Sequence, residues 1–190
     1  MRFNYYFWSL NLQALKTILN GTQLAITIDR LCHQLIETHL HFEHTVLIGL
    51  QPRGIYLSDR IHHTLQKLLP GTPIPYGKLD ITFYRDDFNK GTALHVPSET
   101  DIDFSIENKR VVLIDDVLYT GRTIRSALDA MLDFGRPATV ELLVLIDRRF
   151  TRQLPIQPDY TGRTIDAIIS EKVRVLWQER DGKDEVIILE

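Results

Sequence analysis

Aliphatic runs and helical patterns alternate along the chain, and this alternation predicts its elements. Short runs rich in aliphatic and β-branched residues indicate strands over 16–19, 45–50, 74–84, 111–114 and 139–146. Apolar residues that recur every three or four positions indicate helices over 23–39, 55–69 and 123–134. Strands that alternate with helices favour an α/β fold with a central, mostly parallel sheet flanked by helices.

The last forty residues change character. Leu154-Pro155-Ile156-Gln157-Pro158 cannot form a regular element because of its prolines. Short strand-like pieces follow over 165–169, 172–177 and 185–189, and Asp181-Gly182 is a hairpin turn signal. We therefore expect one domain over 16–190 with a small β-rich unit from about residue 151.

Residues 1–15 join no periodic pattern. We expect them to be a disordered extension, a docking tail or translation from an incorrectly chosen start, and mass spectrometry of the native amino terminus would settle the last of these.

The composition adds limits on function. Of the 190 residues, 44% are hydrophobic and 25% are charged, as in ordinary globular proteins. The net charge of −3 argues against a strongly cationic, nonspecific nucleic-acid binder, while a local basic patch stays compatible with it. The single cysteine, Cys32, excludes an internal disulfide and is expected to be a core residue in a reducing compartment. No apolar run approaches the ~20 residues that span a bilayer, so we expect a cytoplasmic protein without a membrane partner.

Candidate chemistry centres on residues 111–123, where a buried strand runs into two carboxylates, a short turn and a helix. A helix start of this kind presents unpaired backbone N–H groups and the positive end of the helix dipole, which favour a phosphate. Thr120 and Thr123 add hydroxyl donors, and Gly121 lacks the Cβ that would keep an anion away. The carboxylates of Asp115 and Asp116 would instead suit neutral hydroxyls or a divalent cation.

A sugar phosphate satisfies both halves of this motif. The structural alternative is a buried strand that ends in a solvated turn, with the carboxylates capping the helix. The whole run, however, resembles the phosphoribosyl-pyrophosphate (PRPP) signature of type I phosphoribosyltransferases, in which a hydrophobic strand precedes two acidic residues and Thr-Gly-x-Thr. Its form from Asp115 to Thr123 is most similar to the PyrR family, whose members regulate pyrimidine operons and have uracil phosphoribosyltransferase activity.

The resemblance implies a type I phosphoribosyltransferase fold and the conversion of uracil and PRPP to UMP and pyrophosphate. It implies Mg²⁺ carried by PRPP, with no metal bound directly by the protein, and a homo-oligomer. Asp115 and Asp116 would hold the ribose hydroxyls and stabilise the positive sugar of the transition state. The residues expected to bind PRPP are Pro52, Arg53, Gly54, Val117, Leu118, Tyr119, Thr120, Gly121, Arg122 and Thr123.

Two further segments would complete the enzyme. Arg53 follows a strand end, where its planar fork suits an anion, although a surface or capping arginine is an equal alternative. In the resembled family this loop grips pyrophosphate, commonly through a cis peptide. The long polar stretch after Tyr84 suits a lid that excludes water, and Arg85 would be a catalytic residue that reaches pyrophosphate on closure.

The base would lie under a small β-rich hood formed by about residues 151–190, as in the resembled family. Ser170, Glu171, Lys172 and Val173 resemble the segment that lies over uracil. Purine-salvage relatives carry an aspartate just before the Thr-Gly pair to handle a proton on the base, and here Tyr119 takes that position. A tyrosine hydroxyl is a poor base at neutral pH, which favours a pyrimidine over purine transfer.

The rival interpretation is an RNA-binding attenuation regulator that uses UMP and PRPP mainly as signals. In the resembled family the first helix and a basic surface bind leader RNA from pyrimidine operons. The positions here that fit this role are Arg30, His33, Arg148, Arg149, Arg152 and Arg163. Without the resemblance, a solvated helix face is the more frequent explanation for Arg30 and His33.

Overall fold

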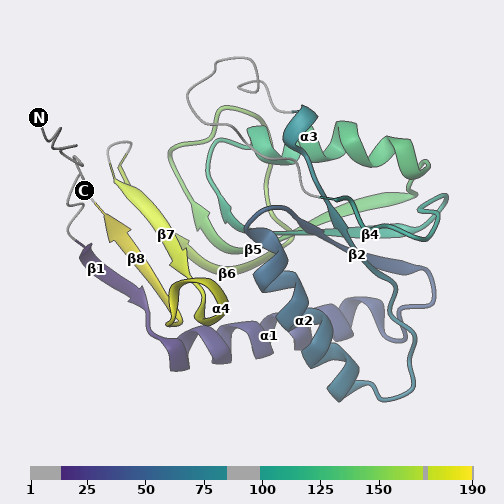
Figure 1. The fold of residues 1–190 in the computed structure, drawn as a ribbon, viewed down its shortest axis with the longest axis horizontal. Coiled ribbons are helices and arrows are strands. Elements are labelled where there is room, and N and C mark those ends of the chain that lie inside the picture. Colours follow the sequence, from purple (N-terminus) through teal and green to yellow (C-terminus); the bar gives the residue numbers. More distant parts are fainter. Residues whose placement is uncertain (1–13, 85–98, 169–170, 190) are drawn as a thin grey trace, which may run out of the picture.

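The computed structural model describes residues 14–84, 99–168 and 171–189, with side chains from Lys16 onward. Its main sheet has five strands in the order β3-β2-β4-β5-β6, all paired in parallel. The strands are β2 (Thr45–Leu50), β3 (Tyr76–Leu79), β4 (Arg110–Leu118), β5 (Thr139–Arg148) and β6 (Tyr160–Ile165). The expected α/β fold with a parallel central sheet is confirmed (Figure 1).

Helices cover both faces of this sheet. α1 (Gly21–His39) and α2 (Gly54–Leu68) lie on one side, and α3 (Arg122–Met131) lies on the other (Figure 1). Successive residues of β4 alternate between the two cores, with Val112 and Ile114 facing α1 and α2 and Val111 and Leu113 facing α3. The carboxyl ends of the strands therefore lie at one edge of a rigid, doubly covered sheet.

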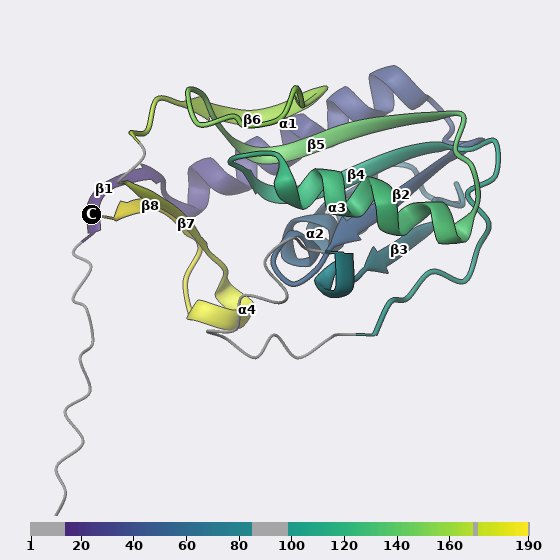
Figure 2. The same cartoon turned by 90° about the horizontal axis from the view of Figure 1, so that it is seen from above.

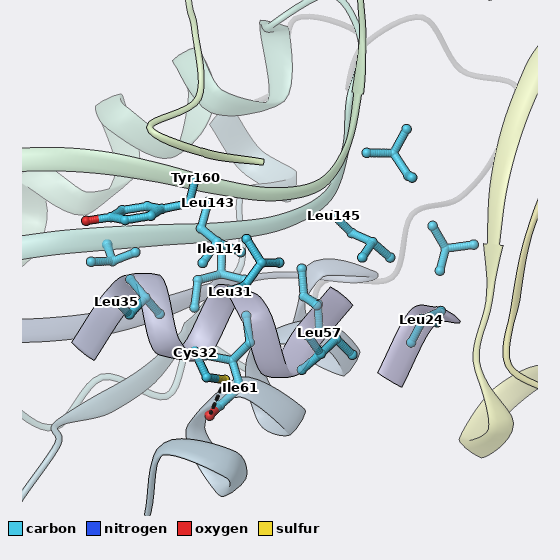
Figure 3. Packing of buried hydrophobic residues seen from close by; sticks show 14 of the residues in the cluster. Leu24, Leu31, Cys32, Leu35, Leu57, Ile61, Ile114, Leu143, Leu145 and Tyr160 are labelled. Atoms are coloured by element: carbon cyan, nitrogen blue, oxygen red, sulfur yellow. Dashed lines mark hydrogen bonds between the residues drawn. The ribbon is translucent and has the colours of Figure 1, made fainter. Parts of the chain in front are cut away.

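The core beneath α1 and α2 is densely filled by aliphatic side chains (Figure 3). Cys32 lies within it, and its Sγ is 3.8 Å from the carbonyl oxygen of Ile61. Burial raises the pKa of this thiol to about 12, so it stays protonated and unreactive at neutral pH. The expectation of a core cysteine is confirmed.

Capping explains where α1 begins. The side chain of Asn20 accepts a hydrogen bond from the backbone N–H of Gln23, and the Gln23 side chain accepts one from the N–H of Asn20. This reciprocal capping satisfies two amide donors that the first helical turn cannot satisfy itself. The helix thus begins at Gly21, two residues before its periodic pattern.

A second, antiparallel sheet with the order β1-β8-β7 stands at one end of the molecule (Figure 2). Its strands are β1 (Ala14–Leu19), β7 (Lys172–Leu176) and β8 (Glu185–Leu189), and α4 (Gln178–Asp181) connects the last two. The hood therefore consists of residues 14–19 and 171–189 rather than 151–190. The hood strand expected from residue 165 is absent from the described residues 166–168, and the strand there is Tyr160–Ile165, which forms the edge of the main sheet by pairing with β5.

Two other local expectations are wrong. The strand expected over 74–84 is limited to Tyr76–Leu79, and Thr82–Tyr84 forms a 3-10 turn that leaves Phe83 67% exposed. Asp181-Gly182 ends the short helix α4 rather than forming a two-residue hairpin, with Gly182 in the left-handed conformation at φ 76°.

Arg60 of α2 fixes the hood to the main domain. Its guanidinium binds Glu179 at 2.8 Å and Asp184 at 2.7 Å and lies 4.9 Å from the ring centroid of the buried Trp177. Within the part of the chain that the structure describes, no helix is long and apolar enough to cross a membrane.

Candidate active site

The acidic pair lies at the carboxyl end of β4, at the centre of the main sheet. Asp115 and Asp116 are each only 7% exposed, and Asp115 Oδ1 accepts a hydrogen bond of 2.9 Å from the N–H of Asp116. Gly54, the first residue of α2, packs directly against this strand end. A Cβ at position 54 would lie 2.7 Å from the carbonyl oxygen of Ile114, so only glycine permits this approach. The start of α2 and the acidic pair are thereby held together.

Arg53 connects the loop before α2 to the acidic pair and to the hood. Its Nε lies 3.3 Å from Oδ2 of Asp116, and its NH2 group donates to the backbone carbonyl of Val175 in β7 of the hood. The preceding Gln51–Pro52 peptide bond is cis, as the resemblance implied for this loop. Burial raises the pKa of Asp116 above the ordinary aspartate value, while the Arg53 guanidinium acts in the opposite direction.

A cavity of about 330 Å³ opens between the acidic pair and the hood. It is lined by Arg53, Asp116, Val117, Lys172, Val173, Arg174, Val175 and Leu189. The structure therefore brings the expected hood residues Lys172 and Val173 to the same space as Asp116 and Arg53. Glu171 lies beside them, and its carboxylate accepts the N–H of Ile168 at 2.7 Å. Ser170 lies outside the described residues.

Residues 119–123, the phosphate loop, connect β4 to α3. Gly121 has a φ of 91°, which favours glycine, and it is the residue from which α3 begins. The Thr120 hydroxyl oxygen accepts the N–H of Arg122 at 3.4 Å, and this contact leaves the hydroxyl hydrogen for another acceptor. The side chain of Leu118 is buried in the core beneath α3, so only its backbone is available to a ligand.

Arg148 is the site residue that the sequence misassigned. It was expected to face RNA, yet it is 5% exposed, and its guanidinium stacks 4.2 Å from the ring centroid of Tyr119. Its NH2 group donates to the carbonyl oxygens of Ile168 at 3.1 Å and Glu171 at 2.9 Å. Among the described residues, its buried Nε has no hydrogen-bond partner. The signal that could have revealed this role is its position as the last residue of β5, at the carboxyl end of a parallel strand whose middle residues are buried.

The other residues expected to contact RNA remain at the surface but have internal partners. Arg30 donates to the carbonyls of Thr161 and Gly162, and Arg163 donates to that of Ile18 at 2.8 Å. Arg149 pairs with Asp166 at 2.7 Å.

His33 lies 3.8 Å from Asp29, while Arg152 contacts both Asp147 and the carbonyl of Tyr119. Arg149 and Arg152, together with the 80% exposed Phe150, line an open groove of about 420 Å³. The structure thus brings only these two of the expected RNA contacts to one depression.

The lid and Arg85 lie outside the described residues. Among the residues that are described, no group of three His, Cys, Asp or Glu side chains could hold a metal ion. The two carboxylates at the end of β4 are oxygen donors of the kind that Mg²⁺ prefers, but they supply a partial set of ligands.

A buried acidic pair, a glycine-containing loop at a helix start and a separate hood define a phosphoribosyltransferase. The chain matches the Phosphoribosyl transferase domain over residues 14–180. It is 46% identical over 171 residues to the "Bifunctional protein PyrR" of Desulfosudis oleivorans, covering 90% of this chain and 94% of that protein. The same protein of Geobacter sulfurreducens is 44% identical over 169 residues, with 88% and 93% covered. The chain therefore belongs to the PyrR family of phosphoribosyltransferases.

Solved structures support the same fold at lower sequence identity. A hypoxanthine phosphoribosyltransferase from Staphylococcus aureus aligns with a TM-score of 0.68 at 20% identity, covering 93% of each chain. The hypoxanthine phosphoribosyltransferase of Trypanosoma cruzi aligns with a TM-score of 0.69 at 17% identity, covering 93% of this chain and 97% of that one. At these identities the likeness establishes the fold alone.

Proposed function

We propose that this protein is a uracil phosphoribosyltransferase that makes UMP and pyrophosphate from uracil and PRPP. One observation carries the proposal: Asp116 of the acidic pair, Arg53 and the hood segment around Lys172 line a single cavity, and the phosphate loop begins directly after the end of the same strand, β4. Such a space suits a ligand with hydroxyls at its centre, phosphates at its ends and a flat base under the hood.

In the proposed reaction the bond from ribose C1 to the pyrophosphate oxygen breaks, and a bond from C1 to uracil N1 forms as N1 loses its proton. Asp115 and Asp116 accept hydrogen bonds from the ribose hydroxyls and stabilise the positive charge that develops on the sugar. The phosphate loop holds the 5′-phosphate, and this fixes the position of C1. Arg53 turns from Asp116 to the pyrophosphate, which frees the carboxylate for the ribose.

Mg²⁺ accompanies PRPP in this proposal. Oxygens of the substrate would hold the ion, and the carboxylates of Asp115 and Asp116 would place negative charge near it. When bound, the ion neutralises part of the charge on the departing pyrophosphate. Arg85 in the lid would add a second cation there, and closure of the lid would exclude water from the reactive sugar.

The base is proposed to be a pyrimidine because Tyr119 stands where purine-salvage relatives need a proton acceptor. Its ring is covered by Arg148, whose guanidinium is a cation and cannot take a proton from the base. The hood segment 170–173 would read uracil largely through backbone groups, since Arg148 holds the carbonyls of Ile168 and Glu171 close to Tyr119.

The proposal is tested by incubating the protein with PRPP, Mg²⁺ and each nucleobase in turn while pyrophosphate release is followed. Turnover with uracil and none with hypoxanthine is expected. Turnover with hypoxanthine but not with uracil would overturn the assignment and would make Tyr119 compatible with a purine.

A regulatory function through RNA is the second candidate, and the groove around Arg149, Arg152 and Phe150 favours it. An exposed aromatic ring beside two arginines suits an unstacked base and its phosphates. The relatives named above carry the word bifunctional in their names. The expected result is a gel shift of a pyrimidine-operon leader RNA that weakens with salt and tightens with UMP. Absence of a shift at low salt would exclude this function.

A further inference from the structure

The segment 152–156 runs beside the phosphate loop and contacts it repeatedly, and we call this segment the strap. The backbone N–H groups of Gln153 and Leu154 both donate to the carbonyl oxygen of Thr120, at 3.0 and 3.3 Å. The guanidinium of Arg152 donates to the carbonyl oxygen of Tyr119 at 2.6 Å. Two consecutive carbonyls of the phosphate loop are thus bound by one neighbouring segment.

These contacts set the direction of the loop's amides. In a planar trans peptide, the carbonyl of one residue and the N–H of the next point in opposite directions. Binding the Tyr119 carbonyl to the strap therefore aims the N–H of Thr120 away from it, and binding the Thr120 carbonyl does the same for the N–H of Gly121. Both N–H groups therefore point away from the strap, and donors arranged in this way suit an anion on the opposite side of the loop.

Side chains reinforce this arrangement. Arg122 donates from its Nε to the side-chain oxygen of Gln153 at 2.9 Å. Gly121 also permits the strap to approach, since a Cβ at that position would lie 3.2 Å from Cδ1 of Ile156. Arg152 is itself held in place, because its NH2 group pairs with Asp147 at the end of β5. The contacts of Arg152 with Asp147 in β5 and with the Tyr119 carbonyl thus link the phosphate loop to the main sheet.

We propose that Arg152 is a positioning residue for the 5′-phosphate: it fixes the Tyr119–Thr120 peptide so that its N–H faces the phosphate of PRPP and UMP. The inference rests on the proposed function and assigns Arg152 a task within the nucleotide site, separate from any contact with RNA. It acts through the loop backbone and does not touch the reacting atoms.

The test replaces Arg152 with methionine, which keeps an unbranched apolar stem like that of arginine and removes the guanidinium with its donors. The KM for PRPP should rise about 10-fold, as expected for the loss of one charged hydrogen bond that supports the anion site. The KM for uracil and kcat should stay within about twofold, and the Kd of UMP measured by calorimetry should rise in parallel with the KM for PRPP. Arg152→Lys, which keeps the charge but reaches one partner at a time, should give an intermediate KM.

Two controls separate positioning from other effects. Arg136→Ala removes an exposed arginine beyond the far end of α3 and should leave every constant unchanged. The double variant Arg152→Met with Asp147→Asn removes the carboxylate left without its partner, and it should not restore the affinity for PRPP.

A KM for PRPP within twofold of wild type would overturn the proposal, as would equal rises in both KM values or restoration by the double variant. If wild type turns over no nucleobase, the proposed function fails, while the difference in UMP affinity still decides the role of Arg152.

Discussion

Both ends of the central sheet bury polar side chains, and the two groups differ in how their hydrogen bonds are satisfied. At the amino end, His39 Nδ1 lies 3.1 Å from the Thr45 hydroxyl, and its Nε2 lies 3.2 Å from both Tyr160 and Glu141. The Tyr160 hydroxyl also donates to Glu141 at 2.6 Å. At the carboxyl end, the described residues include a buried Arg148 Nε with no partner, a buried acidic pair and a cavity of about 330 Å³.

The difference separates polar groups that stabilise the fold from polar groups that await a ligand. A buried network whose members satisfy one another contributes stability and leaves nothing for a substrate to bind. Buried charges beside a cavity cost stability, and they persist where a ligand completes them. The comparison predicts that substitutions at the carboxyl end reduce activity with little effect on folding, and that substitutions at the amino end do the reverse.

The largest effect is expected for Asp116→Asn. Loss of the negative charge beside the developing positive sugar should lower kcat/KM by about 100-fold or more. Because burial raises the pKa of Asp116, its ionised form is less favourable in the folded state than in the unfolded state at pH 7. The melting temperature should therefore equal or exceed that of wild type. Kinetics with PRPP and uracil and a thermal melt measure both quantities.

The control is Asp129→Asn, on the exposed side of α3, which should change neither quantity. An Asp116→Asn protein with full activity would refute the role of this carboxylate in ribose binding. One that is inactive because it is unfolded would refute the contrast between the two ends.

Arg148→Met should have a smaller effect, confined to the base. The variant loses the stacking on Tyr119 and the hydrogen bonds to the carbonyls of Ile168 and Glu171, so the hood segment is held less firmly over uracil. We expect the KM for uracil to rise about 10-fold, with the KM for PRPP nearly unchanged. Arg180→Met, on the exposed surface of α4, is the control. A rise in the KM for PRPP alone would contradict this role.

The site residues at the carboxyl end of the sheet were more predictable than the cluster at the amino end, because they lie in contiguous sequence motifs. Asp115 and Asp116 follow a buried strand, and Arg53 and Gly54 follow its neighbour, so parallel pairing of β2 and β4 places them at one edge. The expected hood residues Lys172 and Val173 reach the same cavity. Local sequence pattern sufficed for the acidic pair and Arg53, because each motif specifies its own strand end, whereas the hood residues were expected from the family resemblance.

The remaining features depend on contacts between distant segments, which periodicity does not encode. β1 pairs with β8 across most of the chain length, and Tyr160–Ile165 joins the main sheet through an irregular connection without a helix. Arg148 and Arg149 are adjacent arginines, yet one is buried beneath the hood and the other is exposed and paired with Asp166. The alternation of side-chain direction along β5 explains why Arg148 is buried and Arg149 is exposed, but only once β5 is known to end at Arg148.

At the amino end, Tyr160→Phe should cost stability and spare catalysis. Its hydroxyl donates to Glu141 and lies beside His39, so its removal leaves a partly buried carboxylate short of one donor. Chemical denaturation should show a loss of about 1–2 kcal/mol in the free energy of unfolding. The KM values and kcat should match wild type at temperatures where both proteins are folded. A selective loss of activity would place this cluster in the functional site.

The smallest effect is a change in pH dependence through His39. Burial lowers the pKa of His39 in the folded protein, although Glu141 opposes this, whereas the unfolded chain has the ordinary histidine value of 6.5. As the pH falls below 6.5, the unfolded state takes up a proton that the folded state resists, so stability declines. The decline is at most about 1.4 kcal/mol per pH unit, the limit for one linked proton.

The part of this decline that comes from His39 should be absent from His39→Gln. The free energy of unfolding of this variant should therefore fall less steeply than that of wild type between pH 7 and the lowered pKa. His41→Gln, at an exposed position, should keep the wild-type slope. Equal slopes in wild type and His39→Gln would show that folding leaves the pKa of His39 unchanged. A wild-type free energy of unfolding that rises relative to His39→Gln as the pH falls would show that Glu141 holds His39 protonated, and the amino end would then hold a buried ion pair.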